Sequence, residues 1–152
     1  MAERRFTARL VIGVRPEVAF DWVADHRNAP RVLEGISEWQ PVGSRTRGAG
    51  ARFRVTMNAL GVGYETTLVL DSWDRPRGLG WRSESGLVPQ RGTWRFRALG
   101  GGTEVSLEIA YEPPGGVLGG LLVARADGVV RGRLRRALDH MRQQLEAERP
   151  SS

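Results

Sequence analysis

The most constraining feature of this sequence is an amphipathic segment near its C-terminus. Residues 130–145 carry apolar side chains at spacings that place them on one face of an α-helix. Arginine, aspartate and glutamine occupy most of the other positions, so the remaining faces suit water. A helix of this kind must bury its apolar stripe against another part of the chain. The stripe consists of Val130, Leu134, Ala137, Leu138, Met141 and Leu145.

The partner predicted for this helix is a set of segments in which apolar and polar residues alternate, as in half-buried β-strands. Short helices at residues 16–24 and 28–33 follow the first of these segments, and Pro16 suits a first helical turn. The sequence therefore predicts an α+β fold, with a curved antiparallel sheet of about seven strands wrapped around the long C-terminal helix. The predicted strands are residues 6–14, 36–42, 51–57, 64–71, 79–85, 92–98 and 103–112.

The side chains of the last two predicted strands also specify a register. If Arg97 lies opposite Glu104, then Phe96 lies opposite Val105, and the following pairs match in the same way. Apolar residues then face apolar residues and charges face opposite or neutral groups, which stabilises a strand pair. We therefore predict a hairpin with this register.

Gly128 and Gly132 interrupt the C-terminal helical pattern. Apolar residues before Gly128 fall on a different face from the stripe that follows, so we expect a bend or two helical pieces between the glycines. The main piece would cover residues 129–146, and residues 147–152 would form a frayed tail.

The composition fits a globular protein. The chain has 152 residues, of which 40% are hydrophobic and 26% charged, so we expect one domain over residues 1–152. It contains no cysteine, which excludes disulfides and thiolate chemistry. The sequence has no visible signal peptide and no apolar stretch near the roughly 20 residues that span a bilayer. We therefore predict a cytoplasmic protein without a transmembrane segment.

The net charge is +6, and all 23 basic residues are arginine. Such a charge raises the question of a nucleic-acid partner. However, the predicted strands place Arg52 and Arg95 on an outer face that also carries Glu84 and Glu104, as in a solvated surface. Nucleic acid is therefore not an expected partner, although the arginine-rich helix leaves an acidic macromolecular partner open as an alternative. The sequence does not decide whether the protein is a homodimer.

The sequence contains no recognisable catalytic or cofactor motif. His26 and His140 are the only histidines, and their spacing does not resemble a zinc site. Phosphate-binding and dinucleotide-binding glycine motifs are absent, as is the Gly-x-Ser-x-Gly elbow. We therefore predict no metal and no cofactor, and the catalytic residues of any enzymatic function are unknown at this level.

Aromatic side chains on the inner faces of the predicted strands are the strongest functional signal. Several of them must fill the core, but a curved sheet covered by one helix leaves space between the two. Aromatic walls with a few hydroxyl groups are the usual lining of a small-molecule site. The predicted ligand-binding residues are Trp39, Phe53, Val55, Met57, Tyr64, Thr66, Trp81, Ser83, Trp94, Phe96, Tyr111, Leu134, Leu138 and Met141.

The order of the predicted elements resembles the helix-grip fold of the START-like (SRPBCC) superfamily. Three stretches are similar to its polyketide cyclase/dehydrase branch. They read RPEVAFDWVAD at residues 15–25, RNAPR at residues 27–31 followed by Gly35 and Ile36, and YEPPGG at residues 111–116. The resemblance covers residues 6–146 and rests on structural motifs, so it implies a fold more directly than an activity.

The resemblance implies a cavity between the sheet and the C-terminal helix that holds a small hydrophobic, ring-containing molecule such as a lipid or polyketide. Some members of this superfamily cyclise or dehydrate polyketides, and others carry lipids, sterols or quinones. An enzyme of the cyclase/dehydratase type is therefore the alternative to a binding protein. In an enzyme, Tyr64, Tyr111, His26 or an arginine at the pocket mouth would move protons or polarise a carbonyl group.

Overall fold

The computed structural model describes residues 3–59, 62–85, 89–112 and 119–148. The stretch predicted to join the last strand to the long helix, residues 113–116, lies outside these ranges. The elements in chain order are β1 (Arg4–Ile12), α1 (Pro16–Ala24), the 3-10 helix η1 (His26–Asn28), α2 (Ala29–Val32), β2 (Ile36–Pro41), β3 (Arg52–Ala59), β4 (Val62–Asp74), β5 (Gly78–Ser85), β6 (Gln90–Leu99), β7 (Gly102–Tyr111) and α3 (Gly119–Glu148).

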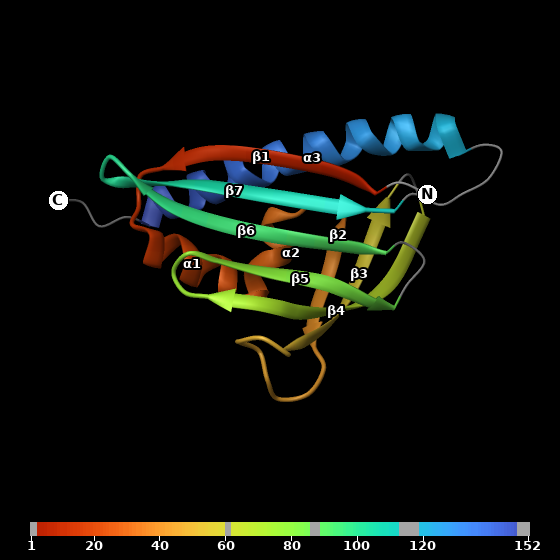
Figure 1. Ribbon diagram of the computed structural model, residues 1–152, viewed down its shortest axis with the longest axis horizontal. Helices are drawn as coiled ribbons and strands as arrows, with labels where there is room; N and C mark the ends of the chain where they lie inside the picture. Colours follow the sequence, from red (N-terminus) through yellow and green to blue (C-terminus); the bar gives the residue numbers. More distant parts are fainter. Residues whose placement is uncertain (1–2, 60–61, 86–88, 113–118, 149–152) are drawn as a thin grey trace.

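The seven strands form one antiparallel sheet in the order β1-β7-β6-β5-β4-β3-β2. In the β6–β7 pair, Arg97 lies opposite Glu104 and Phe96 opposite Val105, so the predicted register is confirmed. β1 pairs with β7, which places the first and last strands of the chain side by side. The sheet curls, with α3 along its concave side next to β1 (Figure 1). This arrangement confirms the predicted helix-grip fold.

The apolar stripe of α3 is buried as predicted. Leu134, Leu138 and Met141 are at most 2% exposed and belong to the main hydrophobic core. The predicted break into two pieces is wrong, because α3 runs without interruption from Gly119 to Glu148. A glycine inside a helix costs only about 1 kcal/mol, whereas burying one large apolar side chain contributes about 1.5–3 kcal/mol. Within the described ranges, no helix combines the length and the hydropathy that crossing a membrane requires.

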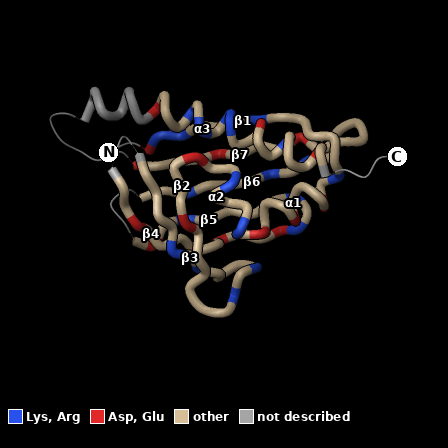
Figure 2. Tube along the Cα trace, turned by 180° about the vertical axis from the view of Figure 1, so that it is seen from behind, with Lys and Arg blue, Asp and Glu red and all other residues tan. Residues whose placement is uncertain are grey.

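Arginines and acidic residues occur along the strands of the sheet (Figure 2), and several of them pair on its convex face. Arg52 pairs with Glu84 at 2.6 Å, and Arg97 pairs with Glu104 at 3.1 Å. These side chains are exposed, so each ion pair contributes at most about 1 kcal/mol. This face is the solvated surface that the alternation predicted.

Helices α1, η1 and α2 close one end of the curled sheet. α1 begins at Pro16 and packs Phe20, which is fully buried, beneath β6 and β7. η1 is capped by Asp25, whose carboxylate accepts a hydrogen bond from the Arg27 backbone N–H at 3.1 Å. The chain then crosses through α2 to the edge strand β2. The candidate functional site lies between these helices and the sheet.

Candidate functional site

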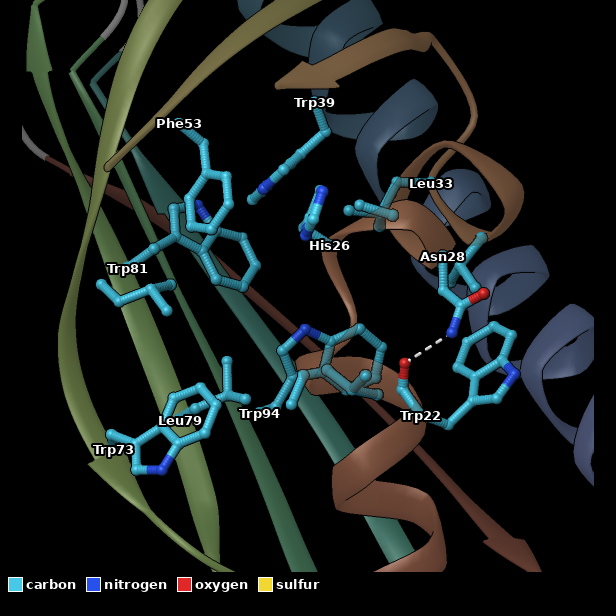
Figure 3. Close-up of a pocket in the computed structure, with 15 residues that line it drawn as sticks. Trp22, His26, Asn28, Leu33, Trp39, Phe53, Trp73, Leu79, Trp81 and Trp94 are labelled. Atoms are coloured by element: carbon cyan, nitrogen blue, oxygen red, sulfur yellow. Dashed lines mark hydrogen bonds between the residues drawn. The ribbon is translucent and has the colours of Figure 1, made fainter. Parts of the chain in front are cut away.

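A small cavity lies between the short helices and the inner face of the sheet (Figure 3). Its volume is about 50 Å³, which is room for a few water molecules. One wall comes from α1, η1, α2 and the residue after α2, and the other wall comes from strands β2 to β6. The lining residues are Trp22, Val23, Ala24, His26, Asn28, Ala29, Val32, Leu33, Trp39, Phe53, Leu70, Trp73, Leu79, Trp81 and Trp94.

All five tryptophans of the chain line this cavity. Between ring centroids, Trp39 lies 6.0 Å from Phe53 and 6.1 Å from Trp81, and its contact with Trp81 is edge-to-face. Trp81 and Trp94 are 5% and 4% exposed, whereas Trp22 and Trp39 are only partly buried. Two indoles therefore form the floor on the sheet, and the others lie closer to the protein surface.

Trp73 reaches the cavity because β4 is irregular. The register of β4 against β5 shifts between Leu70 and Ser72. Such a shift inserts one residue and reverses the side-chain alternation beyond it. Strict alternation would place Trp73 on the convex face, but it packs edge-to-face on Phe20 at 5.1 Å between ring centroids and lines the cavity.

His26 and Asn28 bring polar groups from η1 into the lining. The Asn28 amide serves the local structure, because its Nδ2 donates to the Trp22 carbonyl at 2.8 Å and its Oδ1 accepts from Arg31 at 3.4 Å. The His26 ring lies 5.6 Å from the ring of Phe53 and makes no hydrogen bond within the described ranges. His26 is therefore the side chain best placed to bond to, or exchange a proton with, a molecule in the cavity.

Asp25, the neighbour of His26, is engaged by Arg27. Its two carboxylate oxygens accept hydrogen bonds from Arg27 Nε at 2.9 Å and Nη2 at 2.7 Å. These bonds lower the pKa of Asp25 to about 2, although partial burial acts in the opposite direction. Asp25 is thus ionised and paired at neutral pH and is unsuited to act as a general acid.

The remaining predicted ligand-binding residues lie elsewhere, and some of them fill the core. Four of them are at most 2% exposed, namely Val55, Leu134, Leu138 and Met141. Phe96 stacks on Trp94, with 6.3 Å between the ring centroids. These side chains close the space between α3 and the middle of the sheet. Apart from Trp94, none of them is in the described lining of the cavity.

A second group of predicted residues lies at the end of the inner face where β3 ends and β4 begins. This group consists of Met57, Tyr64, Thr66 and Ser83. The Thr66 hydroxyl donates to the Ser85 carbonyl, and Ser83 Oγ accepts from the Gln90 backbone N–H at 2.9 Å. The hydroxyl groups of Thr66 and Ser83, predicted as ligand contacts, are thus engaged by the sheet's own backbone.

Tyr111 lies beneath α3 near the edge of the sheet. Its O–H donates to Asp127 Oδ1 at 2.9 Å, and Arg4 forms an ion pair with the other Asp127 oxygen. Burial and the hydrogen bond to Asp127 raise the pKa of Tyr111 far above its ordinary value. Burial acts to raise the pKa of Asp127 as well, but the hydrogen bonds from Arg4 and Tyr111 outweigh it and lower that pKa. This cluster ties α3 to β1 and β7 and lies away from the cavity.

The predicted residues that the structure brings together in the cavity are Trp39, Phe53, Trp81 and Trp94. The prediction missed Trp22 and Trp73, together with the wall built from η1 and α2. A signal for that wall was present, because most of its residues lie in the two stretches at residues 15–25 and 27–31 that carry the family resemblance. Within the described ranges, no group of three or more metal-ligand side chains occurs.

Comparison with known proteins identifies a family by sequence. The profile of the polyketide cyclase / dehydrase and lipid transport family matches residues 3–146. No curated protein is significantly similar to the chain in sequence.

Several solved structures have the same fold. The protein TTHA0849 from Thermus thermophilus is 23% identical over 97% of this chain and 100% of its own, with a TM-score of 0.83. The Zhui aromatase/cyclase from a Streptomyces species is 14% identical over 95% and 94%, with a TM-score of 0.81. A START superfamily protein from Mycobacterium smegmatis is 16% identical over 93% and 98%, with a TM-score of 0.75. At these identities the likeness concerns the fold alone.

Proposed function

The chain belongs to the polyketide cyclase / dehydrase and lipid transport family, and on that premise we propose that it binds a small hydrophobic, ring-containing molecule in the tryptophan-lined cavity. The observation that carries this proposal is the convergence of all five tryptophans on one partly open cavity. Aromatic walls with few polar groups are typical of small-molecule sites. A flat ring gains offset-stacked or edge-to-face contacts with indole side chains.

The cavity must enlarge when such a ligand enters. Its volume of about 50 Å³ is well below the roughly 150 Å³ of an engineered protein cavity that admits benzene. One wall is built from η1 and α2, which have only three and four residues. Helices this short are held by tertiary packing and contribute little stability of their own. We infer that this wall moves outward on binding while the sheet keeps its position.

An enzyme of the cyclase/dehydratase type is the alternative, and the position of His26 favours it. The imidazole lines the cavity, and histidine exchanges protons near neutral pH more readily than any other side chain. In this alternative His26 would act as the acid or base on a ligand held among the tryptophans. Tyr64 and Tyr111, which the sequence also suggested for this role, are not in the described lining.

A macromolecular partner for the basic helix has less support. Arg136 forms an ion pair with Glu34 at 2.7 Å, and Arg131 lies 5.1 Å from the centre of the Phe6 ring. These contacts within the protein occupy part of the positive charge that suggested such a partner. We therefore do not propose an acidic protein or RNA as the ligand.

The first test is native mass spectrometry of the protein purified from its own host, followed by extraction of any bound molecule. A defined ring-containing compound is the expected result. Conversion of that compound by the wild-type protein, with loss of conversion in His26→Ala, would favour the enzyme over the carrier. An unchanged compound would favour the carrier.

The second test is a fluorescence titration with N-phenyl-1-naphthylamine, a neutral aromatic probe. Trp39→Ala removes one aromatic wall and is expected to weaken binding about threefold to tenfold, the worth of one aromatic pair. Leu99→Ala is the control, because Leu99 is 43% exposed and lies outside the cavity lining. An empty protein that ignores the probe, or equal affinities in both variants, would refute the proposed site.

A further inference from the structure

Arg133 has a position unlike that of its neighbours on α3. Arg131 lies over Phe6, and Arg136 hydrogen-bonds to Glu34. The hydrogen bond from Arg136 is the main cause that lowers the pKa of Glu34, and the charge of Arg133 contributes less to this shift. The Glu34 carboxylate is therefore engaged by Arg136 and not by Arg133. Arg133 itself is partly buried and forms no ion pair within the described ranges. A partly buried guanidinium without a carboxylate is costly unless other groups satisfy its donors.

The turn at Gly35 shows where this guanidinium lies. Gly35 joins α2 to β2 with a φ angle of 86°, a conformation that favours glycine. A Cβ atom at this position would lie 2.5 Å from Arg133 Nη1 and 2.7 Å from the Asn58 carbonyl oxygen. The guanidinium therefore rests against this turn, beside the end of β3. The absence of a side chain at Gly35 leaves the room that it occupies.

Two more hydrogen-bonding side chains meet at this end of the sheet. Tyr64 lies opposite Met57, and the Gln90 amide donates to Met57 Sδ at 3.4 Å. Burial raises the pKa of Tyr64, while the charge of Arg133 and a hydrogen bond with Gln90 partly offset this. We call Arg133, Tyr64 and Gln90 the Arg133 cluster. The guanidinium, the phenol and the amide can all donate hydrogen bonds, and none of the three side chains carries a negative charge at neutral pH.

We propose that the Arg133 cluster binds an acidic end group, such as a carboxylate, of the ring-containing ligand. This inference rests on the proposed function, because it assumes that the rings of the ligand lie among the tryptophans. A guanidinium and a phenol bind a carboxylate through charge-assisted hydrogen bonds, which are stronger than neutral ones. The ligand class is therefore an aromatic or polycyclic acid.

The sheet sets the length of such a ligand. Phe53 lines the tryptophan cavity, and Met57 lies beside the Arg133 cluster. They are four residues apart on the same face of β3, which corresponds to about 13 Å at about 3.3 Å per residue. Val55 lies between them and is fully buried, so the arm that joins the rings to the acid would have to displace the side chains packed over this part of β3.

The test compares two fluorescent probes that share a pyrene ring and a four-carbon arm, the acid 1-pyrenebutyrate and the alcohol 1-pyrenebutanol. The wild-type protein is expected to bind the acid at least about tenfold more tightly, as a charge-assisted hydrogen bond predicts. Arg133→Gln is expected to abolish this preference without weakening the binding of the alcohol, and Tyr64→Phe is expected to reduce it in part. Arg135→Gln is the matched control, because it removes the same charge from an exposed position on the same helix.

Each outcome decides between the two proposals. If Arg133→Gln and Arg135→Gln lose the same affinity for the acid, only the total charge of the protein matters. If the wild-type protein binds the acid and the alcohol with equal affinity, the acidic group is not recognised. Either result overturns the inference. If Arg133→Gln loses both probes and unfolds at a lower temperature, Arg133→Lys, which keeps the charge, must restore the preference for the acid or the inference fails. Acid binding that depends on Arg133 but is unchanged by Trp39→Ala would refute the tryptophan site and with it the position proposed for the rings, and binding of neither probe would refute both proposals.

Discussion

Replacing Gly92 with alanine tests the packing that forms the floor of the cavity. Gly92 lies in β6 directly opposite Trp81 of β5, and the Trp81 ring covers it. A Cβ atom on residue 92 would lie 2.2 to 2.6 Å from three atoms of this indole. The ring must therefore move by about 1.2 Å, the difference between 2.2 Å and the 3.4 Å at which ordinary contact begins. Because Trp81 is only 5% exposed, this movement displaces other core side chains.

The expected cost follows from two opposing effects. Overpacking a core with an added methyl group destabilises a protein by about 1–3 kcal/mol. Replacing glycine with alanine in a strand raises the free energy of unfolding by about 0.5–1 kcal/mol, because alanine loses less backbone freedom on folding. We therefore expect Gly92→Ala to lower the free energy of unfolding by about 1–2 kcal/mol, which for a chain of this size lowers Tm by roughly 2–8 °C. The near-UV circular dichroism of the tryptophans should change as well.

Gly63→Ala is the matched control for this measurement. Gly63 is also a strand residue, but the nearest atom to its added Cβ would be the Met57 carbonyl oxygen, at an ordinary 3.9 Å. This variant is expected to be as stable as the wild-type protein or slightly more stable. Urea unfolding of both variants provides the comparison. If Gly92→Ala matches Gly63→Ala in stability and keeps the wild-type near-UV spectrum, the contact between the Trp81 ring and residue 92 is not as described.

The remaining predictions concern single hydrogen bonds. Carbon-detected NMR should give a pKa of about 2 for Asp25, and Arg27→Gln should return it toward 3.8; an unchanged value would show that Arg27 does not cause the shift. The pKa of Asp25 in the folded protein lies below its ordinary value, so the stability that the Asp25–Arg27 pair contributes is present above about pH 4 and is lost as the pH falls to about 2. Because Arg27 is 80% exposed, added salt should reduce this contribution to stability. Thr103→Val removes a buried hydrogen bond of 2.6 Å from Oγ1 to the Val14 carbonyl and should cost about 1–2 kcal/mol in urea unfolding. The same change at the partly buried Thr93 should have little effect, and equal costs at both positions would show that the lost bond is not the cause.

Much of the fold could be predicted because the information is local. The stripe that includes Leu134 and Leu138 repeats at helical spacing, and that spacing alone identifies the buried face of α3. Strand alternation and opposite charges likewise predicted the β6–β7 register, including the pair of Arg97 and Glu104. These features depend on a few neighbouring residues, so they can be derived without knowledge of the tertiary structure.

Local rules failed where distant packing outweighed them. Gly128 and Gly132 weaken the helix locally and predicted a bend or two helical pieces; two pieces are wrong, because α3 is continuous. Likewise, Leu134, Leu138 and Met141 have the composition of a pocket wall, but they are packed into the core. Whether an apolar side chain lines a cavity or fills the core depends on which residues face it. The spacing of residues along one helix or strand does not identify those opposing residues.

The sequence by itself determined the elements, the apolar faces and the family resemblance, because each of these follows from residue periodicity or from short motifs. Only the tertiary structure decided the composition of the site. A register shift in β4 turned Trp73 to the inner face, and its pairing with β5 decides where that extra residue falls. The contact between Gly35 and Arg133 joins residues far apart in the chain, and it exists because α3 packs against α2, which ends just before Gly35. Contacts of this kind depend on how the sheet curls around its helices, which is a property of the whole packed chain.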